Sequence, residues 1–226
     1  TGTTFPCASS QTKTIAVADP CGPGTNPPPV VPVTTGYNET PCETAKRLAR
    51  NADSILLKSK ADSLLATITT LATDPFERGF HIYSKFRVNP YDNTDTSIIG
   101  YKCGTLCTGT GAAISCPVLT GYLTLYAAFM HTHPDSGYNA HSAKDVYTMI
   151  EERMQNNRYE ASFVTASNGN QYALTITDYN KAVIFDATKS QYLDGADWKE
   201  NSAIYKAYKL ATKYYLDKFN DLPNKE

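Results

Sequence analysis

Two imidazoles and one carboxylate stand close together in the sequence, at His131, His133 and Asp145. The chain has only four histidines, and three of them fall between positions 131 and 141. A catalytic zinc site commonly takes three protein ligands with nitrogen or oxygen donors and leaves a fourth position open. Two histidines and one aspartate meet that requirement. The leading hypothesis is therefore a metal-dependent hydrolase with Zn²⁺ as its cofactor.

The residues around this group predict the elements that position it. Residues 122–133 are typical of a largely buried strand that ends at the histidines. Because side chains alternate along a strand, His131 and His133 would project from one face. An amphipathic helix is predicted from 142 to 156, and Asp145 lies in its first turn, where the helix dipole favours a carboxylate. A strand end and a helix start would thus enclose a metal ion from two sides.

The stretch His131-Thr132-His133-Pro134, followed by Ser142-Ala143-Lys144-Asp145, resembles the signature of the JAMM (MPN-plus) metalloproteases. That signature is His-x-His-Pro, a short loop and Ser-x-x-Asp, and here eight residues lie between His133 and Ser142, where the family usually has seven. The family cleaves peptide or isopeptide bonds with zinc. The resemblance covers residues 42–187. It implies that His131, His133 and Asp145 bind zinc and that Ser142 helps to stabilise the oxyanion.

The same family carries an upstream glutamate near the start of its sheet, and this glutamate serves as the general base. Glu77 is the candidate, because it follows the first predicted helix and opens a strand-like stretch from Phe76 to Phe86. His81 would share its strand face and line the site as well. The alternative interpretation is that Glu77 is a charged residue at a strand edge.

Each part of the motif also has a structural alternative. Ser142 and Asp145 form a capping box whether or not a metal binds, and the two roles are compatible. His131 and His133 could be ordinary polar residues at a strand end. His141 is expected to be exposed to solvent, and it would replace Asp145 as a ligand if that carboxylate pointed away.

Three functions remain open from the residues. The first is the zinc metallopeptidase, in which Glu77 carries the proton to the leaving amine. The second is an extracytoplasmic binding or scaffold module that keeps the fold without catalysis, and a missing carboxylate near the metal would favour it. The third is a hydrolase that acts on a non-peptide bond.

The remaining sequence predicts an α+β domain with a central mixed β-sheet flanked by helices, a layering like that of JAMM and cytidine-deaminase folds. A capping box at Thr40 and Glu43 opens a helical segment that is interrupted near Ser59 and ends before Asp74. In the helix from 142 to 156, the residues expected to face inward are Val146, Met149, Ile150 and Met154. Further elements are predicted as strands at 161–166 and 171–177 joined by a hairpin, a strand at 181–185, and a closing helix at 201–220.

The beginning of the chain and its cysteines indicate the compartment. Residues 1–38 are rich in Pro and Gly and are predicted to be a flexible leader or lipoprotein-like tether, followed by one domain at 39–226. The six cysteines favour disulfides and an oxidising compartment. Cys7 and Cys21 are candidates for a local loop, and Cys103, Cys107 and Cys116 are interpreted as disulfide-forming rather than metal-binding. We therefore expect a secreted, periplasmic or surface-tethered protein.

Composition limits the partners. With 21 basic and 22 acidic residues the formal net charge is −1, which gives no electrostatic case for nucleic acid. No apolar run reaches the roughly 20 residues that a membrane-spanning helix needs. The expected partner is a peptide or protein substrate.

Overall fold

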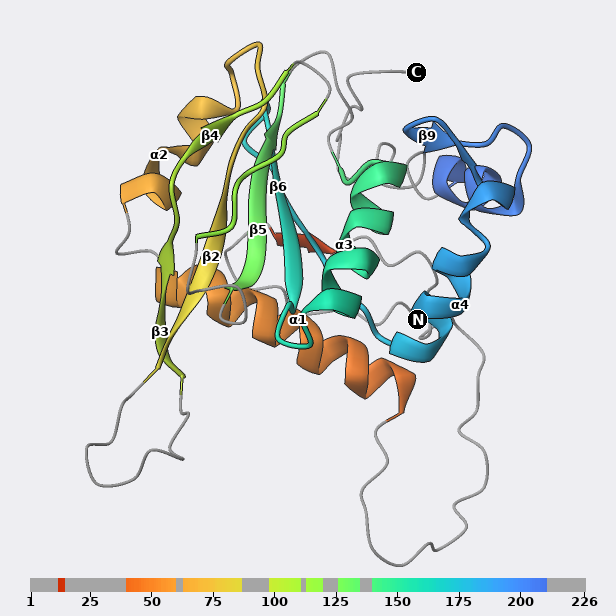
Figure 1. Ribbon diagram of the computed structural model, residues 1–226, viewed down its shortest axis with the longest axis horizontal. Helices are drawn as coiled ribbons and strands as arrows, with labels where there is room; N and C mark the ends of the chain where they lie inside the picture. Colours follow the sequence, from red (N-terminus) through yellow and green to blue (C-terminus); the bar gives the residue numbers. More distant parts are fainter. Residues whose placement is uncertain are drawn as a thin grey trace, which may run out of the picture.

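The chain has the α+β architecture that its sequence predicts. In a computed structural model of the protein, the described residues are 12–14, 40–59, 63–86, 98–110, 113–119, 126–134 and 140–210. They form a central mixed β-sheet with helices packed on both faces (Figure 1). The expectations for Cys7 and Cys21, and for most of the leader, lie outside the described residues.

The central sheet has seven strands, in the order β1-β7-β6-β5-β2-β3, with β4 paired to β2 beyond the end of β3. β5 runs antiparallel to β2 and parallel to β6, so the sheet is mixed. The strands are β1 (Thr12–Thr14), β2 (Arg78–Phe86), β3 (Ile98–Cys103), β4 (Cys107–Thr108), β5 (Tyr126–His133), β6 (Ala161–Ala166) and β7 (Gln171–Leu174). Because backbone ladders hold β5 on both sides, it is a rigid carrier for its side chains.

One face of the sheet is covered by the first two helices. α1 (Pro41–Ser59) begins with the predicted capping box, in which the Thr40 amide donates to Glu43 Oε2 at 2.9 Å and the Glu43 amide donates to Thr40 Oγ1 at 3.2 Å. The predicted interruption is also present, since α2 (Ser63–Leu71) is a separate helix. The core between these helices and the sheet contains Ile55, Leu56, Ile68, Phe80, Ile82, Met130 and Phe163.

The opposite face of the sheet is covered by α3 (Ala143–Gln155), the helix expected to carry Asp145. Met149 packs there with Tyr83, Tyr126 and Tyr159. Ile150 is buried and Val146 is partly buried, as predicted, but Met154 is 44% exposed, so its expected inward position is wrong. Met154 lies in the last turn of α3, where Glu152 and Asn156 are the residues that contact Tyr126 of β5.

The predicted strand at 181–185 is wrong, because these residues belong to helix α4 (Tyr179–Ala187). The Asp178 side chain caps this helix by accepting from the Lys181 amide at 3.0 Å. Phe185 then stacks on Tyr147 at 5.0 Å between ring centroids. The cap and this packing outweigh the strand preference of the β-branched residues. The following elements, η1 (Lys189–Gln191), β8 (Leu193–Asp194), β9 (Asp197–Trp198) and a helix from 203 to the last described residue at 210, complete this layer.

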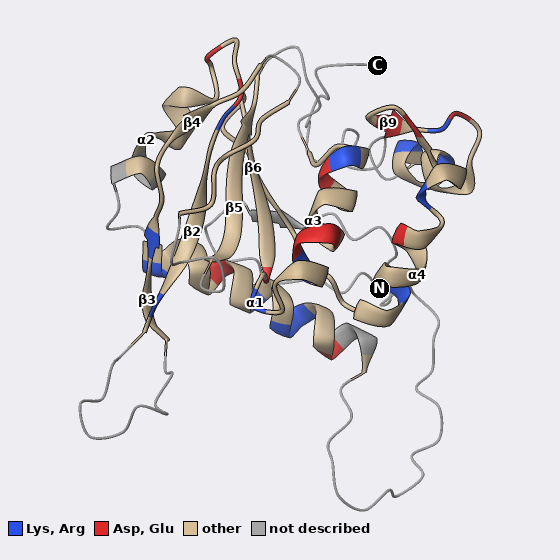
Figure 2. Cartoon of the chain, viewed as in Figure 1, with Lys and Arg blue, Asp and Glu red and all other residues tan. Residues whose placement is uncertain are grey.

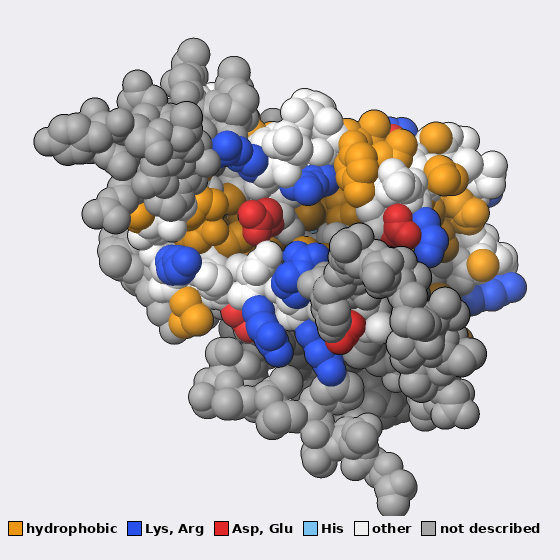
Figure 3. Space-filling model, turned by 90° about the horizontal axis from the view of Figure 1, so that it is seen from below, with side chains coloured by type: hydrophobic (Ala, Val, Ile, Leu, Met, Phe, Trp, Pro, Cys, Tyr) orange, Lys and Arg blue, Asp and Glu red, His pale blue; other side chains and the backbone are white. Residues whose placement is uncertain are grey.

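Charged residues of both signs are spread over the described elements, as Figure 2 shows. Seen from below, on the side where α1 runs in Figure 1, Lys and Arg side chains lie beside acidic and apolar ones (Figure 3). Within the described ranges, no helix is both long enough and apolar enough to cross a membrane.

Candidate metal centre

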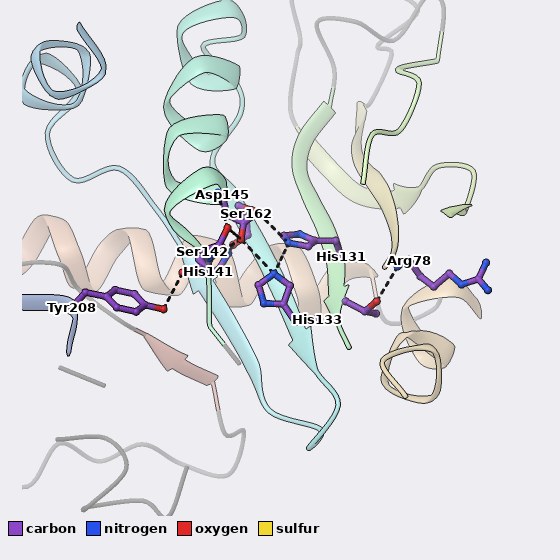
Figure 4. Close-up of polar contacts among 9 residues, drawn as sticks. Arg78, His131, His133, His141, Ser142, Asp145, Ser162 and Tyr208 are labelled. Carbon is purple, nitrogen blue, oxygen red and sulfur yellow. Dashed lines mark hydrogen bonds and ion pairs between the residues drawn. The ribbon is translucent and has the colours of Figure 1, made fainter. Parts of the chain in front are cut away.

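Three side chains meet where β5 ends and α3 begins. The Nε2 atoms of His131 and His133 lie 3.1 Å apart. Asp145 faces both, with Oδ1 3.3 Å from His131 Nε2 and Oδ2 3.4 Å from His133 Nε2 (Figure 4). One ligand atom from each residue falls within 4.8 Å of the other two. The structure therefore brings together the three residues that the sequence proposes as metal ligands.

The two histidines converge because they are two residues apart on a strand. Thr132 between them points to the other face, where its Oγ1 accepts a 2.9 Å hydrogen bond from the Arg78 amide. The parallel ladder to β6 fixes this end of β5, since His131 pairs with Val164 and His133 with Ala166. The alternation predicted from the sequence is confirmed.

Asp145 takes part in the helix cap and in the cluster at the same time. Its Oδ2 accepts hydrogen bonds from the Ser142 amide at 2.7 Å and from the Ser142 hydroxyl at 2.8 Å. The Asp145 amide donates back to Ser142 Oγ at 3.2 Å, which completes the capping box. The capping box is confirmed, and because it orients the carboxylate within its own helix, it is compatible with a metal-binding role for Asp145.

The spacing of the donor atoms fits a tetrahedral ion. Zinc binds nitrogen and oxygen at about 2.0–2.2 Å, which places neighbouring ligands of a tetrahedron about 3.3–3.5 Å apart. The two imidazole nitrogens are 3.1 Å apart, and the contacts of 3.3 Å from His131 to Asp145 Oδ1 and of 3.4 Å from His133 to Asp145 Oδ2 are also close to that edge length. Burial adds to the fit, because the side chains of His131 and His133 are 3% and 7% exposed, while Asp145 is 19% exposed. The group could hold a metal ion.

The electrostatics of the cluster favour an ionised carboxylate. Burial on its own would raise the pKa of Asp145, but the facing imidazoles of His131 and His133 hold that pKa well below its usual range. One feature departs from common metal sites, in which a ligating histidine donates its second ring nitrogen to an oxygen. His131 Nδ1 is buried and has no hydrogen-bond partner among the described residues. His131 is instead supported by Phe129, whose ring stacks on it at 5.5 Å.

Glu77 lies beside the cluster without being one of its three ligands. It directly precedes β2. Gly79, two residues later, pairs with His131 in the β2–β5 ladder. Side chains two residues apart share a face, so Glu77 lies on the face that carries both histidines. Glu77 is only 8% exposed. Burial raises the pKa of its carboxyl, with a further rise from Asp145, although the nearby His131 and His133 act to lower it.

The other two histidines are buried and lie outside the ligand group. His81 Nε2 is 3.2 Å from the Cys116 carbonyl, and its ring packs 5.0 Å from that of Phe129, so it supports the neighbourhood of the cluster rather than joining it. The expectation that His141 is exposed is wrong. His141 is buried, its Nε2 lies 3.0 Å from the Ser162 carbonyl, and burial lowers its pKa to about 3.

Three supporting residues were not singled out by sequence reasoning. Gly79 passes so close to β5 that a Cβ there would lie 2.8 Å from the Met130 carbonyl oxygen. An isolated glycine inside a strand pattern signals such an approach, so this residue was open to prediction. The Tyr208 hydroxyl donates to the His141 carbonyl at 3.3 Å. No local pattern indicates this contact or the position of Phe129 beside the cluster, because both depend on the fold.

Comparisons with known proteins do not assign the chain to a family. No protein-family model matches it, and no curated protein matches it at a significant level. The chemistry of the site therefore has to be argued from the residues themselves.

Proposed function

We propose that the protein is a zinc-dependent hydrolase that cleaves peptide or isopeptide bonds, as the likeness of its motif to the JAMM metalloproteases implies. The observation that carries the proposal is the meeting of His131, His133 and Asp145 at tetrahedral spacing, with the buried Glu77 alongside. A structural helix cap needs Ser142 and Asp145 only. It does not require two imidazole nitrogens to face the same carboxylate.

The residues of the chain have distinct tasks in this proposal. His131, His133 and Asp145 hold the ion, and zinc bound there supplies Lewis-acid chemistry by polarising a carbonyl and acidifying water. The Glu77 carboxylate takes a proton from the attacking water and passes it to the leaving amine. Its raised pKa suits this task, because a carboxylate whose pKa lies closer to the working pH is a stronger base and is still ionised in part.

Ser142 has two tasks that share one proton. Its hydroxyl donates to Asp145 Oδ2 and so orients the ligand. To stabilise the oxyanion of the substrate, the same hydroxyl has to turn away from Asp145, whose Oδ2 then keeps the hydrogen bond from the Ser142 amide. The hydrogen bond from the Ser142 amide keeps the carboxylate in position while the hydroxyl donates to the substrate.

The setting that we propose is extracytoplasmic. A disulfide joins Cys107 and Cys116, and such bonds persist mainly in oxidising compartments. A secreted or surface-tethered peptidase would meet peptides or proteins outside the cytosol.

Metal content is the deciding test. The parent protein and the variants His131→Ala and Asp145→Ala are purified without added metal, and the zinc content of each is measured by mass spectrometry. We expect close to one zinc per chain in the parent and a loss in both variants. Peptide libraries are then screened with the parent and with Glu77→Gln, which keeps the ion and lacks the base. A parent that takes up no zinc even when zinc is supplied would overturn the proposal.

A binding module that holds an ion without catalysis is the second candidate. The observation in its favour is the commitment of the Ser142 hydroxyl to Asp145, which leaves that proton unavailable to a substrate. Stoichiometric zinc without cleavage in any library, and equal behaviour of the parent and Glu77→Gln, would favour this candidate.

A further inference from the structure

A loop closed by a disulfide is hydrogen-bonded to the backbone of Glu77. Cys107 and Cys116 are bonded across nine positions, and we call residues 107–116 the disulfide loop; positions 111 and 112 lie outside the described part. Its first residues form β4, which pairs Cys107 with Gly79 and Thr108 with Arg78. The loop therefore runs along the start of β2, on the side opposite to β5.

Both backbone polar groups of Glu77 are bonded to this loop. The Glu77 amide donates to the Thr110 carbonyl at 3.0 Å, and the Gly109 amide donates to the Glu77 carbonyl at 2.8 Å. Glu77 itself precedes the first residue of β2, so the β2–β5 ladder does not reach it. These two hydrogen bonds are what extend the regular backbone to the residue proposed as the general base.

The loop is tightly folded where it meets Glu77. The Thr110 amide donates to the Ala113 carbonyl at 2.8 Å, and a Cβ on Gly109 would lie only 2.2 Å from the same oxygen. After this turn, Ile114 packs against β2, with its Cδ1 3.0 Å from where a Gly79 Cβ would stand. Gly109 thus packs against Ala113 and Ile114 with no space for a side chain of its own.

The far end of the loop is held through Cys116. Cys116 is bonded to Cys107, and its carbonyl lies 3.2 Å from His81 Nε2. A covalent link of this kind limits the conformations open to the loop when it leaves its native position. Without it, ordering the loop costs chain entropy each time the two bonds to Glu77 form.

The metal ligands do not depend on the loop in this way. His131 and His133 are held by the β2 and β6 ladders, and Asp145 is held by the cap of α3. We infer that the Cys107–Cys116 disulfide is a positioning element for Glu77. Its reduction releases the base while the ion stays bound. The inference rests on the proposed role of Glu77 and adds a redox dependence to it.

The redox step is a thiol–disulfide exchange. A dithiol supplies two electrons and two protons, the sulfur–sulfur bond opens to two thiols, and the dithiol becomes a disulfide. In a reducing cytosol the hydrolase would thus be weak, and oxidation after export would bring Glu77 into place. The chemistry at the metal would then be confined to the compartment where the bond is stable.

Amide hydrogen exchange tests the inference without a substrate. Oxidised protein is compared with protein reduced by a phosphine and with Cys107→Ser/Cys116→Ser, which needs no reductant. We expect exchange at the amides of Glu77 and Gly109 to accelerate by about tenfold or more, as in local opening, with β5 and β6 unchanged. Zinc content should stay the same. Cys103→Ser is the control, because it changes a cysteine of β3 and leaves this disulfide in place.

A further variant disturbs the contact between the loop and Glu77 without changing the cysteines. Gly109→Ala keeps both cysteines but disrupts the turn, so it should accelerate exchange at Glu77 in the oxidised protein. Unchanged exchange at Glu77 after reduction would overturn the inference, and so would an acceleration throughout the sheet with loss of zinc. Absence of zinc in the oxidised parent would instead refute the proposed function. Once a cleaved peptide is known, reduction should lower kcat with little change in KM.

Discussion

Gly79 and His131 pair across the β2–β5 ladder, and the missing side chain of Gly79 leaves room for Phe129 and Met130, which precede that histidine on β5. A Cβ on Gly79 would lie 2.8 Å from the Met130 carbonyl oxygen and 3.0 Å from Phe129 Cζ. Phe129 in turn stacks on the imidazole of His131. The start of β2 thus leaves room for the Phe129 ring that stacks on the candidate ligand His131.

Gly79→Ala should therefore destabilise the protein by about 1–3 kcal/mol, because an added methyl group in a close-packed site forces the backbone or Phe129 to move. Chemical unfolding measures the change. Gly100→Ala is the matched control, since Gly100 is also a strand residue but a Cβ there would meet no atom within 4 Å. Equal stability of the two variants would contradict this account of Gly79.

Ser142→Ala and Asp145→Asn should separate the cap from the metal site. Ser142→Ala removes a cap and should lower the free energy of unfolding by about 0.5–2 kcal/mol. Its zinc affinity should fall by only about tenfold, as for other residues that orient a ligand. Asp145→Asn should lower zinc affinity far more, because the ligating charge is lost. Zinc titration against a competing chelator and urea unfolding measure both effects. A larger loss of zinc affinity in Ser142→Ala than in Asp145→Asn would refute the assignment.

His141 should make the stability depend on pH. Its pKa is about 3 in the folded protein and about 6.5 in the unfolded chain, so the folded protein favours the neutral form of the ring. The stabilisation is complete above pH ~6.5 and is lost as the pH falls from there towards ~3. The loss amounts to about 2 kcal/mol between pH 7 and pH 5.

His141→Gln provides the comparison, because its amide can still donate to the Ser162 carbonyl. Urea unfolding of metal-free protein at several pH values should give a shallower dependence for this variant than for the parent. Parallel curves would show that His141 does not carry the effect.

Glu77→Gln should keep zinc and lower turnover by about 10²–10⁴-fold, the usual contribution of a general base. Glu160→Gln is a fitting control. Burial raises the pKa of Glu160 too, but it precedes β6 at the end of the sheet remote from His131 and His133. A similar loss in both variants would mean that Glu77 has no special role in the chemistry.

Local signals in the sequence were sufficient for the elements that carry the ligands. Alternation placed both histidines on one face of β5, and the Ser142–Asp145 cap located the start of α3. The meeting of His131, His133 and Asp145 followed from these two elements. Both signals act within a few residues, so they do not depend on the rest of the fold.

Features set by distant contacts were missed. His141 is buried where its ring contacts the Ser162 carbonyl on β6. The helix at 179–187 is stabilised by the packing of Phe185 on Tyr147 of α3. Strand β1 was missed as well, since its three residues pair with β7, which is distant in the sequence. Packing against remote partners overrides local preference in each case.

The Ser142–Asp145 cap also bears on which ions suit the site. Asp145 Oδ2 already accepts two hydrogen bonds, which leaves Oδ1 as the freer oxygen of the carboxylate. Such a carboxylate is suited to monodentate coordination. Calcium prefers six to eight oxygen ligands and often takes both oxygens of a carboxylate, whereas zinc is satisfied by single donors from imidazole and carboxylate. In the proposed zinc site, the first turn of α3 would thus favour an ion that accepts a single carboxylate oxygen over one that needs both.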